Sequence, residues 1–168
     1  MEKIMQQYTN ITHTFEPIYD ARSKILILGT FPSVKSRENN FYYGHPQNRF
    51  WKVLAAVTGC KLPVTVDEKK SFLLVNGIAV WDVIQSCSIK GSDDSSITDV
   101  VPNDFTKLFA ETKLSVIAAN GTKAYDLYQK YVYPVTGRDI VKMPSTSPAN
   151  ASWKLDRLCE EYARLFTS

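Results

Sequence analysis

Residues 24–30 read KILILGT, and this stretch decides the fold class. Its apolar residues follow one another without alternating with polar ones, and Gly29 ends the run. A short apolar run of this kind predicts a strand that is buried on both faces. Such strands are typical of a parallel sheet whose two faces are both covered.

Three further strands are predicted, at residues 78–84 (IAVWDVI), 114–119 (LSVIAA) and 139–143 (DIVKM). Residues 86–96 are predicted to form a polar loop. Strands that alternate with helices predict an α/β fold with three layers, in which helices cover a central four-stranded, mostly parallel sheet. The helices are predicted at residues 48–59, 65–76, 103–110, 122–132 and from 152 onward.

Individual residues are expected to set the ends of these helices. Thr65 and Glu68 have the spacing of a capping box, and Gly59 is suited to end the helix at 48–59. Asn103 and Ser152 are expected to cap the helices that follow them. The last helix should have one buried apolar face, made of Leu155, Leu158, Cys159, Tyr162, Leu165 and Phe166.

The chain has 168 residues, which predicts a single domain. Lys and Arg number 20 and Asp and Glu number 17, so the net charge is +3. This mildly basic balance permits contact with nucleic acid but does not demonstrate it. The sequence contains no block of five like charges, so a DNA-binding surface would have to be assembled by folding.

The three cysteines, Cys60, Cys87 and Cys159, form no CxxC pair and no metal-binding spacing with His13 or His45. We therefore expect no metal site, and four-thiolate iron–sulfur clusters are excluded by the count. Scattered cysteines fit a reducing cytoplasm. The first fifteen residues lack the apolar segment of a signal peptide, and no apolar run approaches the length of a membrane span, so we expect no membrane association.

Polar or Gly/Pro-rich segments follow the four predicted strands. They read GTFPS, WD, NGT and PSTSPAN in chain order. In parallel α/β sheets the ligand binds beyond the carboxyl ends of the strands. We therefore expect these four segments to converge and to form a site.

Two of these segments carry a family resemblance. Residues 29–51 read GTFPSVKSRENNFYYGHPQNRFW, which resembles the first motif of the mismatch-specific uracil-DNA glycosylases in sequence and in spacing. Residues 143–150 read MPSTSPAN and resemble the Pro-Ser loop that is the second motif of the uracil-DNA glycosylase superfamily. The resemblance covers about residues 24–166 and implies a uracil-DNA glycosylase-like fold.

One position departs from the common pattern. Related enzymes place an Asn or Asp in the first motif to hold the attacking water, and Phe31 stands there in this chain. The motifs are most similar to those of the deoxyinosine (hypoxanthine)-DNA glycosylase family, which uses an Asn further along the same loop. This resemblance implies Asn39 as the catalytic residue, with Asn40 as its near competitor. The alternative is that both asparagines are turn residues.

The damaged base would be held by residues from several of these segments. The resemblance implies that Tyr43 stacks on the extruded base, and an aromatic face suits any flat base. An ionised Asp82 can accept the N1–H of hypoxanthine. Phe31 and His45 complete the expected base-binding set. The alternatives are a core role for Tyr43, a turn-stabilising hydrogen bond for His45 and a structural cap for Asp82.

A further set of residues is expected to bind the DNA backbone. Hydroxyls, amides and cations are the groups that contact phosphates. An ordinary Ser/Pro turn and a plain turn at residues 120–123 are the alternatives. The expected set is Ser33, Arg49, Lys123, Ser145, Thr146, Ser147, Pro148 and Asn150.

The resemblance therefore implies a monofunctional DNA glycosylase that removes a deaminated base, preferably hypoxanthine, from damaged DNA. We expect no cofactor and no partner subunit, so the enzyme should be a monomer. One alternative is a mismatch-specific uracil-DNA glycosylase. Another is a non-catalytic DNA- or nucleotide-binding protein of the same fold, since fold alone does not separate these functions.

Overall fold

The computed structural model describes residues 8–12, 15–32, 36–37, 41–90 and 96–167. Its centre is a four-stranded sheet in the order β3-β2-β6-β7, in which all neighbouring strands are parallel. The strands are β2 (Ile25–Gly29), β3 (Ile78–Asp82), β6 (Val116–Asn120) and β7 (Val141–Met143). The predicted parallel sheet is confirmed, and its most buried strand, β2, is the KILILGT segment.

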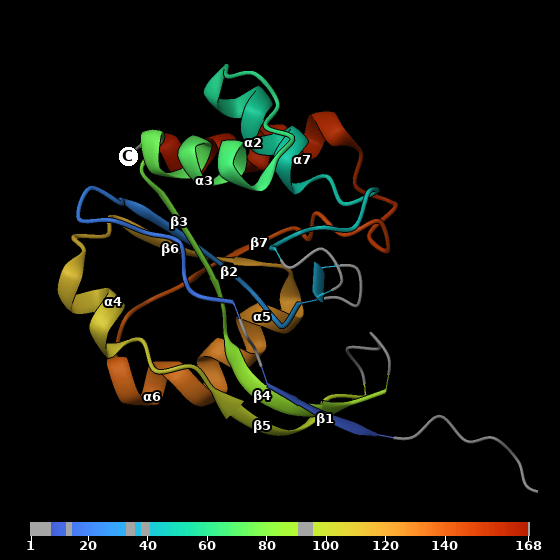
Figure 1. Cartoon of the computed structure of the whole chain (residues 1–168), viewed down its shortest axis with the longest axis vertical. Coiled ribbons are helices and arrows are strands. Elements are labelled where there is room, and N and C mark those ends of the chain that lie inside the picture. Colours follow the sequence, from blue (N-terminus) through green and yellow to red (C-terminus); the bar gives the residue numbers. More distant parts are fainter. Residues whose placement is uncertain (1–7, 13–14, 33–35, 38–40, 91–95, 168) are drawn as a thin grey trace, which may run out of the picture.

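Alternate residues of β2 face two separate apolar clusters, because side chains of a strand point to opposite faces. Ile25 and Ile27 pack with α2 (Phe50–Thr58), α3 (Val66–Val75) and α7 (Leu155–Ala163). Leu26 and Leu28 pack with the cluster on the other face, which includes residues of α4 (Thr106–Glu111) and α5 (Thr122–Leu127). Figure 1 shows the resulting three layers, as predicted.

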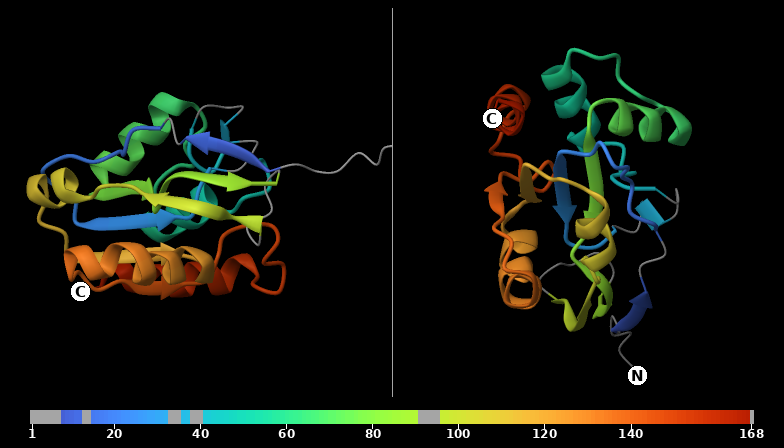
Figure 2. Two further views of the ribbon diagram at one scale, coloured as in Figure 1. Left: turned by 90° about the horizontal axis from the view of Figure 1, so that it is seen from below. Right: turned by 90° about the vertical axis from the view of Figure 1, so that its left-hand side faces the viewer.

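Two predicted helix boundaries are confirmed. Thr65 and Glu68 form a capping box in which the Thr65 side chain accepts from the Glu68 backbone and Glu68 accepts from the backbone of Thr65. Helix α2 ends at Gly59, which has a left-handed backbone with φ of 72°. The helix that begins at Thr122 is longer than predicted: it continues as a π-helix (Tyr128–Val132) and as α6 (Tyr133–Thr136). These orange helices run along one side of the sheet in Figure 2.

Two predicted caps are wrong. Helix α7 begins at Leu155, after Lys154, and no side chain caps it, so Ser152 lies outside the helix. Leu155 is exposed, although the rest of the predicted apolar face is buried or half-buried. Asn103 is buried, and its amide donates to the carbonyls of Asp82 and Ile84 at 2.8 and 3.3 Å. It therefore ties the chain after β3 and caps no helix.

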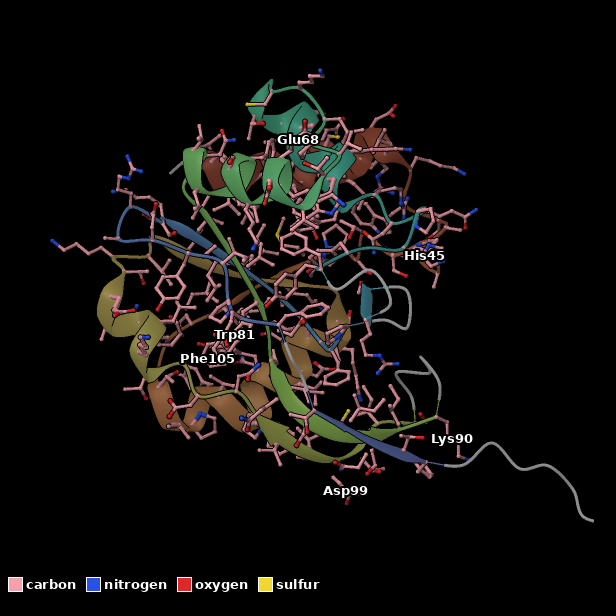
Figure 3. All side chains as sticks on the ribbon, in the orientation of Figure 1. His45, Glu68, Trp81, Lys90, Asp99 and Phe105 are labelled. Carbon is pink, nitrogen blue, oxygen red and sulfur yellow. The ribbon has the colours of Figure 1, made fainter. Side chains whose placement is uncertain are left out.

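A second sheet was not predicted. It is three-stranded and antiparallel, in the order β1-β4-β5, and consists of β1 (Thr9–Thr12), β4 (Ile84–Ile89) and β5 (Thr98–Pro102). The prediction of a polar loop at residues 86–96 is thus wrong as far as Ile89. Trp81 and Phe105 meet beside this sheet with ring centroids 5.0 Å apart (Figure 3). Within the described ranges, no helix has both the length and the apolar character needed to span a bilayer.

Candidate active site

A cavity of about 320 Å³ lies at the carboxyl ends of the parallel strands. Residues 29–32 line it after β2, Asp82 at the end of β3, Asn120 at the end of β6, and residues 145–148 after β7. The predicted convergence of the four segments is therefore confirmed. His45, which also lines the cavity, lies on the right-hand side of the view in Figure 3.

Asp82 and Tyr43 approach each other across Gly29. A Cβ atom added at Gly29 would lie 2.4 Å from Asp82 Oδ1 and 3.1 Å from Tyr43 Oη. Asp82 is only 4% exposed, and it pairs with Gly29 in the register of β3 and β2. The absent side chain at Gly29 thus makes room for a carboxylate and a phenol at the cavity wall.

Gly29→Ala should lower the single-turnover rate on lesion-containing DNA about tenfold, because a new methyl group forces a reorganisation of the packed site. The measurement is cleavage of a duplex with one deaminated base at saturating enzyme. Gly59→Ala is the control: a Cβ at Gly59 meets nothing within 4 Å, although its backbone is left-handed. A Gly29→Ala variant with the wild-type rate would contradict the close approach seen at this position.

The Tyr43 ring lines the cavity and is held in place by stacking on Phe50. The two ring centroids lie 3.8 Å apart with planes at 15°, and the Tyr43 backbone has the left-handed φ of 53° that is rare for a non-glycine residue. The pKa of Tyr43 lies well above its usual value, because the phenol is buried and, to a smaller extent, because Asp82 is nearby. The neighbouring Asn120 side chain reduces this rise but does not cancel it. The phenol therefore stays protonated and can donate a hydrogen bond. Stacking on a base remains a prediction.

His45 and Phe31 line the same cavity. His45 Nδ1 accepts a hydrogen bond from the Gln47 backbone at 3.1 Å, and the His45 carbonyl accepts from Asn48 at 3.0 Å. These bonds are the turn-stabilising role given above as the alternative. Phe31 is half-buried, and the Arg37 guanidinium lies 5.8 Å from its ring centroid. Base contact by His45 and Phe31 stays a prediction.

Asn120 belongs to the NGT segment that is expected at the site, but the sequence does not predict a role for its side chain. Its side chain donates to Thr146 Oγ1 at 3.0 Å and accepts from the Thr146 backbone at 2.9 Å. Thr146 in turn donates to Asn48 Oδ1 at 2.8 Å. The signal for Asn120 was its position directly after a buried apolar strand. Ile89 also lines the cavity, and it was missed because β4 was taken as a loop.

Two of the expected phosphate-binding residues have other contacts. Thr146 is only 1% exposed. Its amide donates to the buried Asn120, and its hydroxyl donates to the half-buried Asn48. The Arg49 guanidinium donates to backbone carbonyls of residues 146, 147, 150 and 153. These contacts do not favour direct phosphate binding by Thr146 or Arg49, because their polar groups already have protein partners.

The other expected DNA contacts lie around the cavity. Ser145, Ser147 and Pro148 line it. Lys123 and Asn150 line a second hollow of about 390 Å³, which shares Ser145 and Ser147 with the first. The Asn150 amide also donates to the Ser145 carbonyl at 3.0 Å. Ser33, Asn39 and Asn40 lie outside the described residues.

The hydrogen-bonding groups of the cavity suit recognition of a polar planar group. It combines a buried carboxylate, a protonated phenol and an asparagine amide with apolar rings, which is the usual make-up of a ligand site. No cluster of three or more His, Cys, Asp or Glu side chains suited to a metal ion occurs in the part of the chain that the structure describes.

The chain is similar to one protein family over most of its length. The family model of the uracil DNA glycosylase superfamily matches residues 16–166. A Methanosarcina acetivorans protein named hypoxanthine DNA glycosylase is 37% identical over 152 residues, which cover 89% of this chain and 95% of the relative. A Methanosarcina barkeri protein of the same name is 34% identical over 112 residues, 66% of this chain and 71% of the relative.

A solved structure has the same fold. It is the solution NMR structure of a Methanosarcina acetivorans protein described as a candidate uracil DNA glycosylase. The TM-score is 0.79 at 33% sequence identity, and the match covers 94% of this chain and 97% of that one. The three-layer arrangement is thus common to both chains.

Proposed function

The chain belongs to the uracil DNA glycosylase superfamily, and we propose that it hydrolyses the N-glycosidic bond of deoxyinosine in damaged DNA and releases hypoxanthine. It is a DNA glycosylase, a hydrolase of N-glycosyl bonds that begins base excision repair. The enzyme has to extrude the damaged nucleotide, because the bond and the base edge cannot be reached inside the duplex.

The buried Asp82 carboxylate in the cavity wall is the observation that supports a deaminated base as the substrate. Hypoxanthine has a hydrogen on N1, which an ionised carboxylate accepts. Adenine, the base from which hypoxanthine arises by deamination, has a lone pair on N1, which a carboxylate repels. Asp82 would therefore favour the deaminated base over the normal one. The names of the two Methanosarcina relatives agree with this substrate.

The rest of the cavity would serve the chemistry of bond cleavage. Positive charge develops on the sugar and negative charge on the departing base, so preorganised dipoles carry much of the catalysis. Tyr43 and Asn120 line the cavity, and under this proposal their phenol and amide donate to an oxygen of the base. Asn39, with Asn40 as the alternative, would position the attacking water, as the resemblance to the deoxyinosine-DNA glycosylases implies.

Uracil is the second candidate substrate, and the same carboxylate favours it. Uracil has a hydrogen on N3, so Asp82 could accept it as it would accept the N1–H of hypoxanthine. Against uracil stands Phe31, which occupies the position of the water-binding Asn or Asp in the mismatch-specific enzymes. A side chain without polar atoms cannot hold that water.

The test is single-turnover cleavage of duplex oligonucleotides that carry one deoxyinosine or one deoxyuridine, with abasic sites revealed by hot alkali. We expect hypoxanthine to be released faster than uracil. Release of uracil alone would retain the family and overturn the substrate. Binding of both duplexes without cleavage would point to a non-catalytic DNA-binding protein.

We further propose that the enzyme works as a monomeric, single-domain protein in the cytoplasm and without a bound metal. The cavity lining of this chain already combines a carboxylate, a phenol and an asparagine amide with apolar rings, which agrees with a site that works in a monomer. Cys60, Cys87 and Cys159 are free thiols, which agrees with a reducing compartment.

A further inference from the structure

Most of the second motif lies in the 144–153 loop, and Met143 directly precedes this loop. Several carbonyl oxygens of Met143 and of the loop accept hydrogen bonds from the protein. The Met143 carbonyl accepts from the Gly121 amide at 2.9 Å, and the Pro144 carbonyl accepts from Tyr162 Oη at 2.7 Å. The Ser145 carbonyl accepts from Asn150. A carbonyl oxygen that faced a phosphate would repel it, so this orientation matters for a loop that is to approach DNA.

Arg49 binds the remaining inward carbonyls of the loop. Its Nη2 donates to the Ser147 carbonyl at 2.8 Å and to the Asn150 carbonyl at 3.1 Å, and its Nη1 donates to the Trp153 carbonyl. The Thr146 carbonyl accepts from the Arg49 backbone at 3.0 Å and from Nε at 3.4 Å. One side chain thus fixes both halves of the loop.

In the part of the chain that the structure describes, the loop carbonyls are the polar partners of the Arg49 side chain. Arg49 directly precedes α2, where the helix dipole disfavours a cation. Among the described residues, no carboxylate forms an ion pair with it. A planar guanidinium with five donors in a fixed fork can bind several carbonyls at once, which the ammonium of a lysine cannot do in the same geometry.

The outer side of the loop carries hydroxyl groups that are prepared to donate. Ser145 Oγ accepts from the Ser147 amide at 3.1 Å, and Ser147 Oγ accepts from the Ala149 amide at 3.1 Å. Neither hydroxyl donates to any residue in the described ranges, so both hydrogens are available to an acceptor. Both serines line the cavity and the adjoining hollow.

We propose that Arg49 is a positioning residue that draws the carbonyls of the 144–153 loop inward, so that the loop offers the Ser145 and Ser147 hydroxyl hydrogens to the phosphates that flank the extruded nucleotide. The proposal rests on the proposed function for the identity of the ligand, a DNA strand. It replaces the expected contact between Arg49 and a phosphate. The Arg49 side chain acts on DNA through the loop and does not touch it.

The test compares Arg49→Lys with Arg49→Ala. The lysine keeps the positive charge but lacks the planar guanidinium that binds several carbonyls at once. Arg22→Ala is the matched control, because it removes the same charge as Arg49→Ala. The Arg22 side chain is 85% exposed and lies at the amino ends of the strands, far from the cavity. The first measurement is amide hydrogen exchange of Thr146, Ser147 and Asn150 in the free protein. The second is the enzyme concentration that half-saturates single-turnover cleavage.

We expect faster exchange of the loop amides in both Arg49 variants and a rise of roughly tenfold in the half-saturating concentration, nearly as large for lysine as for alanine. The limiting rate should change less than the half-saturating concentration. Tyr162→Phe, which removes the donor to the Pro144 carbonyl, should shift both measurements in the same direction by a smaller factor, and it serves if the Arg49 variants unfold.

Wild-type exchange and affinity in Arg49→Lys, with a loss only in Arg49→Ala, would overturn the proposal in favour of a simple charge effect. So would an equal loss in Arg22→Ala. Hydrogen exchange requires no substrate. A wild-type protein that does not cleave deoxyinosine would therefore count against the proposed function, and the exchange data would still decide the role of Arg49.

Discussion

Asp82→Ala should slow single-turnover release of hypoxanthine roughly a hundredfold, because the proposed charge-assisted hydrogen bond between the Asp82 carboxylate and the base would be lost. DNA affinity should stay nearly unchanged, since phosphate contacts supply most of it. The carboxylate is 4% exposed at the cavity wall. The measurement is the cleavage rate at saturating enzyme, with the dissociation constant for the same duplex measured in parallel.

Asp82→Asn separates charge from shape in the same experiment. An amide oxygen still accepts the N1–H of hypoxanthine but lacks the negative charge, so we expect an intermediate rate. The preference for deoxyinosine over deoxyadenosine in competition binding should fall, because the neutral side chain no longer repels the adenine N1 lone pair. Asp67→Ala, at an exposed position in α3, is the control. Unchanged rates in both Asp82 variants would remove this residue from the base pocket.

Asn39→Ala should lower the limiting rate of hypoxanthine release by a factor on the order of a hundred to a thousand, which is the typical loss when one preorganised catalytic dipole is removed. The sugar cation is reactive, so we expect an amide that positions water to suffice here, although it is a weaker catalyst than a carboxylate. The measurement is single-turnover cleavage at saturating enzyme, and binding of the lesion duplex should persist.

Asn40→Ala is the matched control for this prediction, because it removes the same amide from the adjacent position. We expect it to retain most of the activity. The reverse result, a loss in Asn40→Ala alone, would exchange the two roles. Full activity in both variants would mean that another group positions the water.

The parallel sheet, and the edge at which its site lies, could be predicted because each strand is marked by its own apolar run and by the polar residue that ends it. A strand buried on both faces has to be apolar throughout, and residues 25–29 are buried without exception. The polar residues that end these strands, Asp82 and Asn120, then have to meet at one edge. The face of the sheet to which each side chain points depends on how the strands pair, and the sequence of one strand does not specify that pairing.

The antiparallel sheet could not be predicted, because its strands are stabilised by pairing and not by their own composition. β4 reads IQSCSI, and only Ile84, Cys87 and Ile89 are buried. β1 and β5 are short and largely exposed. Such segments resemble loops until a neighbouring strand supplies hydrogen-bond partners.

The roles of Arg49 and Thr146 could not be predicted for a different reason. The sequence identifies them as donors, but it does not say toward which side the groups point. Thr146 lies between two serines, and Arg49 lies at the start of a helix. At both kinds of position, a phosphate contact is the common use of such residues. In the folded chain both residues face inward. Arg49 donates to carbonyls of the loop, and the Thr146 backbone donates to the Asn120 side chain.

The corner between the two sheets has a consequence for how specificity can change. Only Val83 separates β3 from β4, and its amide donates to the Gly29 carbonyl at 2.9 Å, while the Asn103 amide holds the carbonyls on both sides of it. Asp82 thus lies at the junction of the two sheets, whereas the 144–153 loop is attached through Arg49 to the start of α2. If the two proposed roles hold, we expect substitutions in the loop to change DNA affinity and substitutions at Asp82 to change base preference, each largely without the other.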